Sequence, residues 1–332
     1  MTSANNRYLV TGSTGFVGNR LINSLLLDGL TVRALTRKEM PSPGTSAIEY
    51  RCCDLTDPSS MHGIAEGIHT VFHLAGHAHT NTGQKGIHYQ TSLDGTRNLL
   101  TELKRSHVKR CVYVSSVKAM PEPATDCLDE DATGKPTDEY GMSRYLAEKL
   151  LLGTANETGL HVSILRPALV YGPGCKGNLA SMLRWTDYGL FPPIPETGNR
   201  RSMVGVDDLV HAIRLAAESS KANGQIFIIT DNEQYSTRRI YNAMRSALGK
   251  PEIHWSIPVK LLHMLGLLGN LPGLIFRNRA NFNNHLCDKL LGSSCFHSNK
   301  AATLLEYHPV NILEDVLPDM VENLRQQSSR DR

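Results

Sequence analysis

Short apolar segments alternate with longer segments of helical periodicity through the first half of the chain. The apolar segments are rich in β-branched residues and cover residues 7–12, 30–36, 47–54, 69–76, 109–116 and 160–167. Strand–helix–strand alternation at this spacing predicts a parallel sheet with helices on both faces. The nearly continuous apolar character of the strands agrees, because parallel strands are buried on both sides.

The first predicted strand leads into a glycine-rich loop, TGSTGFVG, at residues 11–18. Glycines at the end of a strand and the opening of a helix permit a tight turn. They also let backbone N–H groups approach a pyrophosphate at the positive end of that helix. The loop therefore predicts a Rossmann-type dinucleotide site. Its expected cofactor contacts are Gly12, Thr14, Gly15, Phe16, Val17 and Gly18.

The pattern changes after residue 171, where loops rich in Gly and Pro lead into helices, with one more strand expected at 224–230. We therefore expect an α/β fold with a doubly wound parallel sheet and a smaller, mostly helical C-terminal lobe that binds the substrate. The dinucleotide-binding domain would cover 1–171, with 203–230 returning to it. The lobe would cover 172–202 and 231–332.

The end of the second predicted strand distinguishes between the two nicotinamide dinucleotides. An NAD site shows an acidic residue there, which binds the ribose 2′-hydroxyl. This chain has Thr36, Arg37 and Lys38 instead. Two cations suit a 2′-phosphate, so NADP(H) is favoured over NAD(H), with Arg37 as the contact; a solvated basic turn is the alternative. Asp54 and Leu55 are expected at the adenine, although Asp54 would equally suit a helix cap.

Residues 139–149, EYGMSRYLAEK, contain two tyrosine–cation pairs with the same spacing. Tyr145 precedes Lys149 by four positions, and Tyr140 precedes Arg144 by four. One helical turn separates the members of each pair, so each tyrosine can lie beside its own cation. A phenol beside a cation is suited to proton transfer. The residues alone leave open which pair is the reactive one.

These segments together resemble the extended short-chain dehydrogenase/reductase family, in the branch of nucleotide-sugar 4-epimerases and 4-keto reductases. TGSTGFVG is similar to the family's glycine loop, VFHLAG to the strand under the cofactor, and YVSSVKA to the segment with the catalytic serine. YGMSRYLAE resembles the motif Tyr-Gly-x-Ser-Lys-x-x-x-Glu, and LRPALVYGPG resembles the strand leading to the substrate. NRRSMVGVDDLVHAI resembles the segment that holds the nucleotide diphosphate.

The resemblance implies that Tyr140 is the catalytic tyrosine, because the motif's Tyr-Gly falls on Tyr140 and Gly141. Ser116 would polarise the carbonyl at C4 of the sugar, and Arg144 takes the position of the family's lysine. Arginine keeps the charge and the hydrogen-bond donors but does not readily release a proton. A proton relay would therefore have to run through ribose or water.

The other tyrosine pair and two departures from the family follow from the same alignment. Tyr145 and Lys149 are expected as an exposed pair on the outer face of the helix. Ser92 stands where the family has an asparagine, and Pro121 stands where a glycine is common. These departures predict a weakened structural hydrogen bond near the active site and a changed loop over the substrate.

The resemblance also implies further contacts with cofactor and substrate. The remaining cofactor contacts would be Leu74, Ala75, Gly76, Tyr140, Arg144 and Pro167. The substrate contacts would be His77, Ser116, Lys118, Asn178 and Arg201, with Arg201 clamping the diphosphate and Asn178 near the base. No metal site is expected, because the histidines of HLAGHAH lack a carboxylate or cysteine at ligand spacing.

Three functions remain. The first is an NADP(H)-dependent reductase of a nucleotide-linked 4-keto sugar, a UDP-N-acetyl-hexosamine or its 4-keto-6-deoxy derivative, and Arg37 favours it. The second is a UDP-sugar 4-epimerase that retains NAD. The third is an NAD(P)-binding sensor or scaffold without turnover, which Arg144 and Ser92 would fit. A steroid or flavonoid-type ketone is an alternative substrate, and Arg201 with Asn178 favours a nucleotide diphosphate instead.

Composition restricts the partners and the cellular compartment that we expect. A formal charge of +3, without a basic run interleaved with aromatics, argues against nucleic acid as a partner. The least polar stretch, 257–276, includes a lysine, a histidine and a proline, which argues against a membrane span. Seven scattered cysteines predict free thiols rather than a disulfide framework. We expect a cytoplasmic protein, and the resemblance implies a homodimer.

Overall fold

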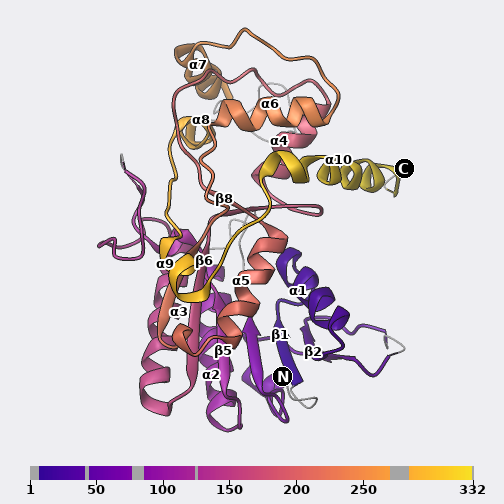
Figure 1. Cartoon of the computed structure of the whole chain (residues 1–332), viewed down its shortest axis with the longest axis vertical. Coiled ribbons are helices and arrows are strands. Elements are labelled where there is room, and N and C mark those ends of the chain that lie inside the picture. Colours follow the sequence, from indigo (N-terminus) through magenta and orange to yellow (C-terminus); the bar gives the residue numbers. More distant parts are fainter. Residues whose placement is uncertain (1–6, 42–44, 77–85, 124–125, 270–283, 331–332) are drawn as a thin grey trace.

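A seven-stranded parallel sheet forms the centre of the computed structural model, which describes residues 7–41, 45–76, 86–123, 126–269 and 284–330 (Figure 1). The strand order is β3-β2-β1-β4-β5-β6-β9. The strands are β1 (Arg7–Thr11), β2 (Thr31–Thr36), β3 (Ile48–Cys52), β4 (Thr70–His73), β5 (Arg110–Val114), β6 (His161–Pro167) and β9 (Gln225–Ile229). The order reverses between β1 and β4, which is the doubly wound arrangement, and every strand expected from the sequence is confirmed.

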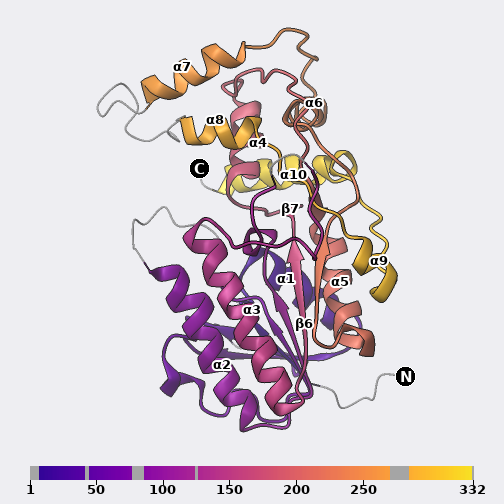
Figure 2. The ribbon, with the colours of Figure 1, turned by 90° about the vertical axis from the view of Figure 1, so that its left-hand side faces the viewer.

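Helices cover both faces of the sheet. One face packs against α1 (Phe16–Leu27), α5 (Val206–Glu218) and α9 (Asn299–Leu305). The other face packs against α2 (Gly95–Lys104) and α3 (Glu139–Thr158), which lie side by side in Figure 2. The short helical turns are η1 (Pro58–Met61), η2 (Tyr89–Asp94), η3 (Val117–Ala119) and η4 (Ser220–Ala222).

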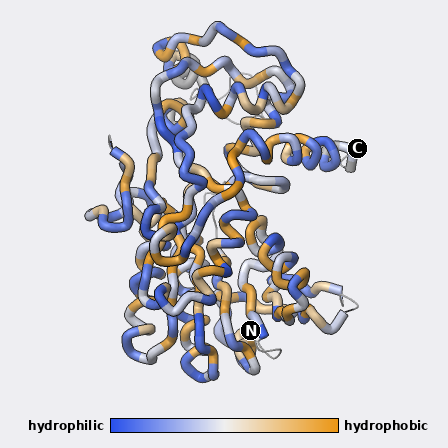
Figure 3. Tube along the Cα trace, viewed as in Figure 1, coloured by the Kyte–Doolittle hydropathy of each residue, from blue (hydrophilic) through white to orange (hydrophobic). Residues whose placement is uncertain are grey.

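Alternate residues of each strand enter different cores, because successive side chains of a strand point to opposite faces. Tyr8 and Val10 of β1 belong to the core under α1 and α5. Leu9, between them, belongs to the core under α2 and α3. Figure 3 shows hydrophobic positions gathered along the central strands and the helices that pack on them. This double burial accounts for the unbroken apolar runs in the sequence.

A helical lobe lies beyond the carboxyl ends of the strands (Figure 1). It contains α4 (Asn178–Asp187), α6 (Thr237–Ala247), α7 (Val259–Gly269), α8 (Asn284–Leu291) and α10 (Leu313–Arg330). A separate core of apolar residues from α4, α6 and α10 holds it together. The two-stranded parallel sheet of β7 (Leu169–Tyr171) and β8 (Met203–Gly205) joins it to the main sheet. None of the helices in the described part of the chain combines the length and the apolar character needed to cross a membrane.

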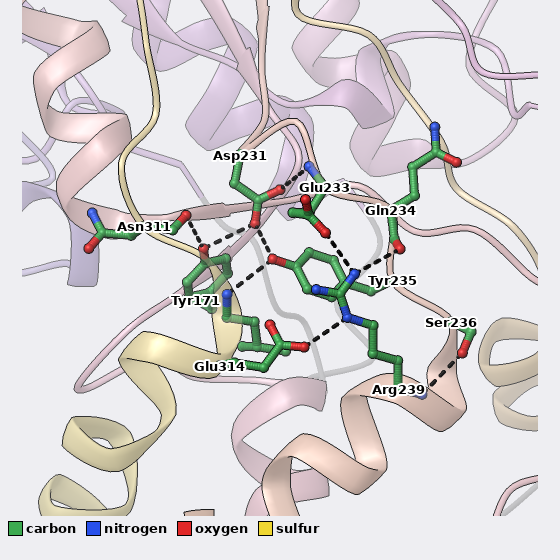
Figure 4. Close-up of polar contacts among 10 residues, drawn as sticks. Tyr171, Asp231, Glu233, Gln234, Tyr235, Ser236, Arg239, Asn311 and Glu314 are labelled. Carbon is green, nitrogen blue, oxygen red and sulfur yellow. Dashed lines mark hydrogen bonds and ion pairs between the residues drawn. The ribbon is translucent and has the colours of Figure 1, made fainter.

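A buried polar cluster lies where the main sheet meets the lobe (Figure 4). The Asp231 carboxylate, just after β9, accepts hydrogen bonds from the hydroxyls of Tyr171 at 3.0 Å and Tyr235 at 2.8 Å. The Tyr171 hydroxyl is also 3.0 Å from the Asn311 carbonyl oxygen, and the Leu313 N–H donates to the Tyr235 hydroxyl at 3.0 Å. Burial raises the pKa of Asp231 to about 6, against the opposing effect of these hydrogen bonds. The cluster thereby ties β7, β9 and the start of α10 together.

Arg239 of α6 extends this cluster on the lobe side. Its guanidinium forms ion pairs with Glu233 at 2.7 Å and with Glu314 at 2.8 Å. The guanidinium carbon also lies 4.5 Å from the centre of the Tyr235 ring. Both acidic partners are half-exposed, so the ion pairs add orientation more than free energy of folding.

The prediction that the cysteines are free thiols is wrong for one pair. Cys127 and Cys295 form a disulfide across 168 residues of sequence, with their Cα atoms 4.4 Å apart. Backbone hydrogen bonds hold the two segments side by side: the Leu128 N–H donates to the Cys295 carbonyl at 3.0 Å and the His297 N–H to the Leu128 carbonyl at 2.9 Å. This pairing of distant segments brings the sulfurs together. The prediction holds for Cys52, Cys53, Cys111, Cys175 and Cys287.

Candidate active site

The glycine loop is packed so closely that side chains are excluded from it. Gly12 has a φ of 68°, and a Cβ there would lie 2.9 Å from the Ala75 backbone nitrogen at the end of β4. A Cβ on Gly18 would lie 2.2 Å from the Gly12 carbonyl oxygen. Gly15 caps α1 without a side-chain hydrogen bond, and the first turn has no acidic residue. The positive end of α1 is therefore open to an anion, as the sequence predicts.

The remaining residues of this loop differ in their surroundings: Ser13 is buried, and Val17 packs against the core under α1. Thr14 and Gly15 are exposed, whereas Phe16 and Val17 are half-buried. The ring of Phe16 lies against Gly172, where an added Cβ would be 3.4 Å from its tip. The glycine loop thus adjoins the segment that leads from β7 into the lobe.

A buried histidine fixes the ends of β1 and β4 beside the loop. His73 Nδ1 lies 2.8 Å from the Thr11 hydroxyl, and Nε2 lies 2.9 Å from the Thr96 hydroxyl. The Thr96 hydroxyl donates to the Ser92 carbonyl, so it accepts from Nε2–H, and Nδ1 then accepts from Thr11. Burial, aided by the charge of Arg144, lowers the pKa of His73 to about 3. His73 is a neutral structural residue with both nitrogens in use.

Ser92 itself departs from the family in the way that the sequence predicts. Its buried hydroxyl has no hydrogen-bond partner among the described residues. An asparagine at this position has an amide with two donors and an acceptor to offer.

Three more cofactor contacts implied by the resemblance follow β4. Leu74 and Ala75 are half-buried, and Gly76 is exposed. His77 lies outside the described residues.

The ends of β2 and β3 carry the residues expected around the adenosine. The Thr36 hydroxyl donates to the Lys38 carbonyl at 2.7 Å, while Arg37 and Lys38 are exposed. Asp54 accepts hydrogen bonds from the N–H and the hydroxyl of Thr56 at 2.9 and 2.8 Å. It therefore forms a turn, and Asp57 rather than Asp54 caps the next helix, through the Ser59 N–H at 3.0 Å.

Leu55 and Pro167 are buried. Leu55 packs beneath Gly95, where an added Cβ would be 3.1 Å from the Leu55 Cβ. Pro167 is the last residue of β6. Both lie at carboxyl ends of strands, the edge at which ligands of doubly wound sheets bind.

The start of α3 is pressed against the segment that carries Ser116. The Asp138 side chain caps the helix by accepting from the Gly141 N–H at 2.6 Å. A Cβ on Gly141 would lie 2.1 Å from the Lys118 carbonyl oxygen, so only glycine allows this contact. Ser116 caps η3 by accepting from the Lys118 N–H at 3.2 Å. The contact brings the start of α3, with Tyr140, onto the segment that starts at Ser116.

Arg144 is buried beneath Tyr140 and the end of β4. Its guanidinium carbon lies 5.3 Å from the centre of the Tyr140 ring and 5.8 Å from that of Tyr113, and its Nη1 donates to the Tyr113 hydroxyl at 3.1 Å. A Cβ on Gly76 would lie 2.0 Å from Nη2. Burial alone lowers the pKa of Arg144, but the two tyrosines outweigh burial and raise it. The Nε atom has no partner among the described residues.

The second tyrosine pair lies elsewhere on α3. The Lys149 Nζ lies 4.9 Å from the centre of the Tyr145 ring. Lys149 is exposed and Tyr145 is half-buried. Only the first pair is joined to Tyr113 and Gly76. The geometry therefore agrees with the register that the resemblance implies.

Glu148 of the same motif is structural. It forms a bidentate ion pair with Arg166, with donor–acceptor distances of 3.0 and 2.5 Å, and accepts from the Ser115 hydroxyl at 2.5 Å. All three side chains are buried. They bind α3 to β5 and β6, which leaves Ser116 rather than Ser115 for the site.

The residues expected to bind the substrate lie on both sides of the junction. Arg201 donates to the Gly292 carbonyl at 3.1 Å and to the Thr237 hydroxyl at 3.3 Å, and burial lowers its pKa. Asn178 is exposed at the first position of α4. Lys118 forms an ion pair with Glu122 at 3.1 Å.

Across the described ranges, no three His, Cys, Asp or Glu residues gather as metal ligands would.

Sequence reasoning missed Tyr113. It stands in β5 between Val112 and Val114, so it reads as an ordinary core residue of a buried strand. The signal that singles it out is its hydrogen bond with Arg144, which joins residues 31 positions apart. Such a contact has no local pattern in the sequence.

A parallel sheet of this order, a glycine loop ahead of α1 and a tyrosine–arginine pair beside a serine define a dinucleotide-binding enzyme of the Rossmann type. Residues 8–230 match the model of the NAD dependent epimerase/dehydratase family. The chain belongs to this family, which confirms the resemblance to the extended short-chain dehydrogenases/reductases.

The sequence identity to individual relatives is low. The chain is 28% identical to UDP-glucose 4-epimerase of Vibrio cholerae over 330 residues, 97% of this chain and 96% of that one. It is 25% identical to N-acetyl-alpha-D-glucosaminyl-diphospho-ditrans,octacis-undecaprenol 4-epimerase of Escherichia coli O157:H7 over 276 residues, 81% of this chain and 82% of that one. The crystal structure of UDP-glucuronic acid 4-epimerase from Bacillus cereus with NAD superimposes with a TM-score of 0.74 at 21% identity, covering 97% of this chain and 99% of that one.

Proposed function

We propose that the chain is a 4-epimerase of a sugar linked to a diphosphate, of the UDP-N-acetyl-hexosamine class. The observation that carries the proposal is the placement of Tyr140 and Arg144 against the Ser116 segment, which only Gly141 permits. Two of the curated relatives are named for epimerisation at C4 of a diphosphate-linked sugar, on UDP in one and on undecaprenol in the other. A hydroxyl, a phenol and a cation at one place suit proton transfer at a sugar carbinol.

The residues present fit a nicotinamide dinucleotide. Gly12, Gly15 and Gly18, with the open end of α1, would hold the pyrophosphate. The orphaned Nε of Arg144, buried under Gly76, is a donor that would suit the nicotinamide ribose. When bound, the nicotinamide would supply reversible hydride transfer at C4, so that the sugar could be oxidised to the 4-ketone and then reduced from the opposite face. NAD is present in the B. cereus structure of the same fold.

The chain's own residues would handle the proton and the charge. Tyr140, in its phenolate form, takes the proton from the C4 hydroxyl and later returns it. Ser116 donates a hydrogen bond to the same oxygen and stabilises the negative charge that develops there. Arg144 would place its positive charge beside this proton transfer, since its guanidinium carbon lies 5.3 Å from the centre of the Tyr140 ring. Arg201 would hold the diphosphate while the sugar turns over.

The test is a substrate panel with both cofactors. Purified protein would be incubated with UDP-glucose, UDP-N-acetylglucosamine or a polyprenyl-diphosphate sugar, and the 4-epimers would be separated by chromatography. Epimerisation without net consumption of cofactor supports the proposal. Consumption of NADPH in step with a reduced sugar would show a reductase, and the absence of turnover on all substrates would favour the sensor.

A reductase is the second candidate, and the exposed cations after β2 favour it. Arg37 and Lys38 stand where an NAD site has a carboxylate, and the Thr36 hydroxyl is already used by the loop. If Arg37 binds a 2′-phosphate, Arg37→Ala should reduce the preference for NADPH over NADH by roughly 1.5–3 kcal/mol. Calorimetry would measure the affinities of wild type and variant for NADPH and NADH. Equal affinities of the wild type for the two cofactors would remove the argument for NADP(H).

The diphosphate contact can be tested separately. Arg201→Ala should weaken UDP binding by about 2 kcal/mol and leave the affinity for the dinucleotide unchanged, because its guanidinium lies in the lobe. Arg238→Ala is the comparison, since Arg238 is another arginine of the lobe, on α6, and donates to the Ile194 carbonyl at 2.9 Å; this variant should keep the wild-type affinity for UDP. Unchanged UDP affinity in Arg201→Ala would move the diphosphate site to other residues.

The assembly is also a proposal. The family resemblance implies a homodimer that packs through two long helices, and α2 and α3 lie side by side on one face of the sheet (Figure 2). Light scattering on the purified protein would give the mass of the particle. The cytoplasmic location and the boundaries of the substrate lobe likewise stay predictions.

A further inference from the structure

Arg144 is a buried cation for which the described residues supply no acidic partner. Its side chain is 4% exposed, and none of the ion pairs in the described part of the chain includes it. The guanidinium donates to the Tyr113 hydroxyl at 3.1 Å and to the Val114 carbonyl at 3.4 Å. A charge buried without a counter-ion is costly unless neutral acceptors hold it. The position of the guanidinium therefore depends on the acceptors that it finds.

Tyr113 is a rigid acceptor. It is fully buried in β5, and its ring stacks on His73 with the two ring centres 5.1 Å apart. The hydroxyls of Thr11 and Thr96 fix both nitrogens of His73, so the ring beneath Tyr113 is fixed as well. Burial raises the pKa of Tyr113, against the opposing charge of Arg144, so the phenol is neutral at ordinary pH. Its oxygen can accept from Arg144 at any pH at which the protein is folded.

The side chain at position 144 is longer than the lysine of the family motif. A lysine ends in a compact ammonium, whereas a guanidinium is a planar fork with donors in fixed directions. Such a fork can lie beneath the Tyr140 ring only if its far end is held. Nη1 is the atom bonded to Tyr113, and Nη2 lies against Gly76. The two contacts act on the two ends of the fork.

We propose that Tyr113 is a positioning residue, which holds the Arg144 guanidinium between the two phenol rings so that its charge acts on Tyr140. The inference rests on the proposed function, in which Tyr140 transfers the proton. Tyr113 touches neither substrate nor cofactor in this scheme. It allows an arginine to stand in the place of the family's lysine.

The first test follows the ionisation of Tyr140 directly and needs no enzymatic activity. Phenolate formation is measured by ultraviolet absorbance as the difference between wild type and Tyr140→Phe. The same difference is then measured between Tyr113→Phe and the double variant with Tyr140→Phe. Loss of the anchor should raise the pH at which the Tyr140 phenolate forms by roughly one unit, because the guanidinium no longer stays beside it. An unchanged midpoint overturns the proposal.

The second test measures the coupling of the two side chains. Tyr113→Phe should lower the melting temperature in the wild-type background and lower it by less than half as much in an Arg144→Met background. An equal decrease in melting temperature in both backgrounds would show that Tyr113 and Arg144 act independently, and would overturn the proposal that Tyr113 holds Arg144. Tyr307→Phe is the matched control, because Tyr307 is also buried and its hydroxyl makes one hydrogen bond, to the Thr230 carbonyl at 3.1 Å. Its effect should be the same in both backgrounds.

Measurements of turnover distinguish a failure of this proposal from a failure of the proposed function. If the wild type epimerises a sugar, its pH–rate profile should contain a limb in which the rate increases with pH. The midpoint of this limb should move to higher pH in Tyr113→Phe and stay in place in Tyr307→Phe. A limb that does not move overturns the positioning role. If the wild type turns over no sugar, the proposed function fails, while the phenolate titration and the coupling still decide whether Tyr113 anchors Arg144.

Discussion

Tyr140 and Tyr145 lie on the same helix, yet their side chains face different parts of the molecule. Five residues along a helix correspond to a rotation of about 140° between their side chains. Tyr140 therefore meets Arg144 on the side of Tyr113 and Gly76, and Tyr145 meets Lys149 on another side. The spacing from tyrosine to cation is identical in the two pairs. What differs is the surface of the molecule that each pair faces.

Tyr140→Phe removes one hydroxyl from the proposed acid–base residue. Folding and dinucleotide binding should persist, while kcat falls about a hundredfold or more, the usual contribution of a positioned acid or base. Tyr145→Phe is the control, and its kcat should be close to that of the wild type. The measurement is turnover of the best substrate from the panel. A loss confined to Tyr145→Phe would show that Lys149 is the partner of the reactive tyrosine.

Arg144→Lys restores the residue of the family motif. A lysine can release a proton, so a relay becomes available that arginine does not support. We expect a higher kcat or a shifted alkaline limb of the pH–rate profile in this variant. A kcat and a profile identical to those of wild type would show that proton release at position 144 does not limit the reaction.

At the scale of elements, the contact between α3 and η3 builds the site. Asp138 caps α3, and Gly141 brings its first turn against the Lys118 carbonyl. Ser115, Glu148 and Arg166 then bind the middle of α3 to β5 and β6. The helix is therefore held at two levels, so that the Tyr140 side chain is presented by a rigid element.

Two glycines of α3 give a matched test of this contact. At Gly141 an added Cβ would lie 2.1 Å from a backbone oxygen, whereas at Gly153 nothing lies within 4 Å. Gly141→Ala should destabilise the fold by roughly 1–3 kcal/mol through overpacking and should reduce kcat by displacing Tyr140. Gly153→Ala should stabilise it by about 0.5–1 kcal/mol, since alanine favours the helix. Urea denaturation of both variants decides this, and equal effects would contradict the contact.

On the scale of the whole molecule, two distant connections join the sheet to the lobe. The Asp231 cluster ties β7, β9 and α10 together, and the Cys127–Cys295 disulfide ties the loop beyond η3 to the segment before α9. The same segment passes beside Arg201, because the Ser202 N–H donates to the Ser294 carbonyl at 2.9 Å. The Arg201 N–H also donates to the carbonyl of Tyr235, a member of the Asp231 cluster, at 2.9 Å, so both connections adjoin Arg201.

The Asp231 cluster predicts a pH dependence of stability. The pKa of this carboxyl is raised from 3.8 to about 6 in the folded protein, so the folded state holds its proton more tightly than the unfolded state. Its contribution is fully present below about pH 4 and is lost as pH rises through 6, on the order of 2–3 kcal/mol in all. Asp231→Asn keeps a neutral side chain, so the stability of this variant relative to wild type should increase between pH 5 and 8.

Urea denaturation at pH 5 and pH 8 checks this dependence. Asp57→Asn is the control: the pKa of Asp57 is lowered by its hydrogen bonds with Ser59, so its contribution is constant over this range. A difference between Asp231→Asn and wild type that stays constant from pH 5 to 8 would contradict the raised pKa of Asp231.

The disulfide predicts a sensitivity to reductant. Replacing both Cys127 and Cys295 by serine should lower the free energy of unfolding by about 2–4 kcal/mol, because the cross-link closes a long loop in the unfolded chain. Reductant should lower the stability of the wild type and leave the double variant unchanged. The measurement is denaturation with and without dithiothreitol. Seven titratable thiols in the denatured, unreduced wild type would show that the bond does not form.

Local patterns in the sequence determined the sheet, the glycine loop and the presence of two tyrosine–cation pairs on one helix, although they did not say which pair is reactive. Each of these depends on residues that are near neighbours along the chain: apolar runs that must be buried on both faces, glycines at one turn, and a cation one helical turn after a phenol. The tertiary structure alone decided which residues hold the site in place. Tyr113 and Arg144, Cys127 and Cys295, and Tyr171 and Asp231 are separated by 31, 168 and 60 residues. Such contacts leave no periodic signal, because they arise only when packed elements bring distant side chains together and when burial removes the water that would otherwise bind their polar groups.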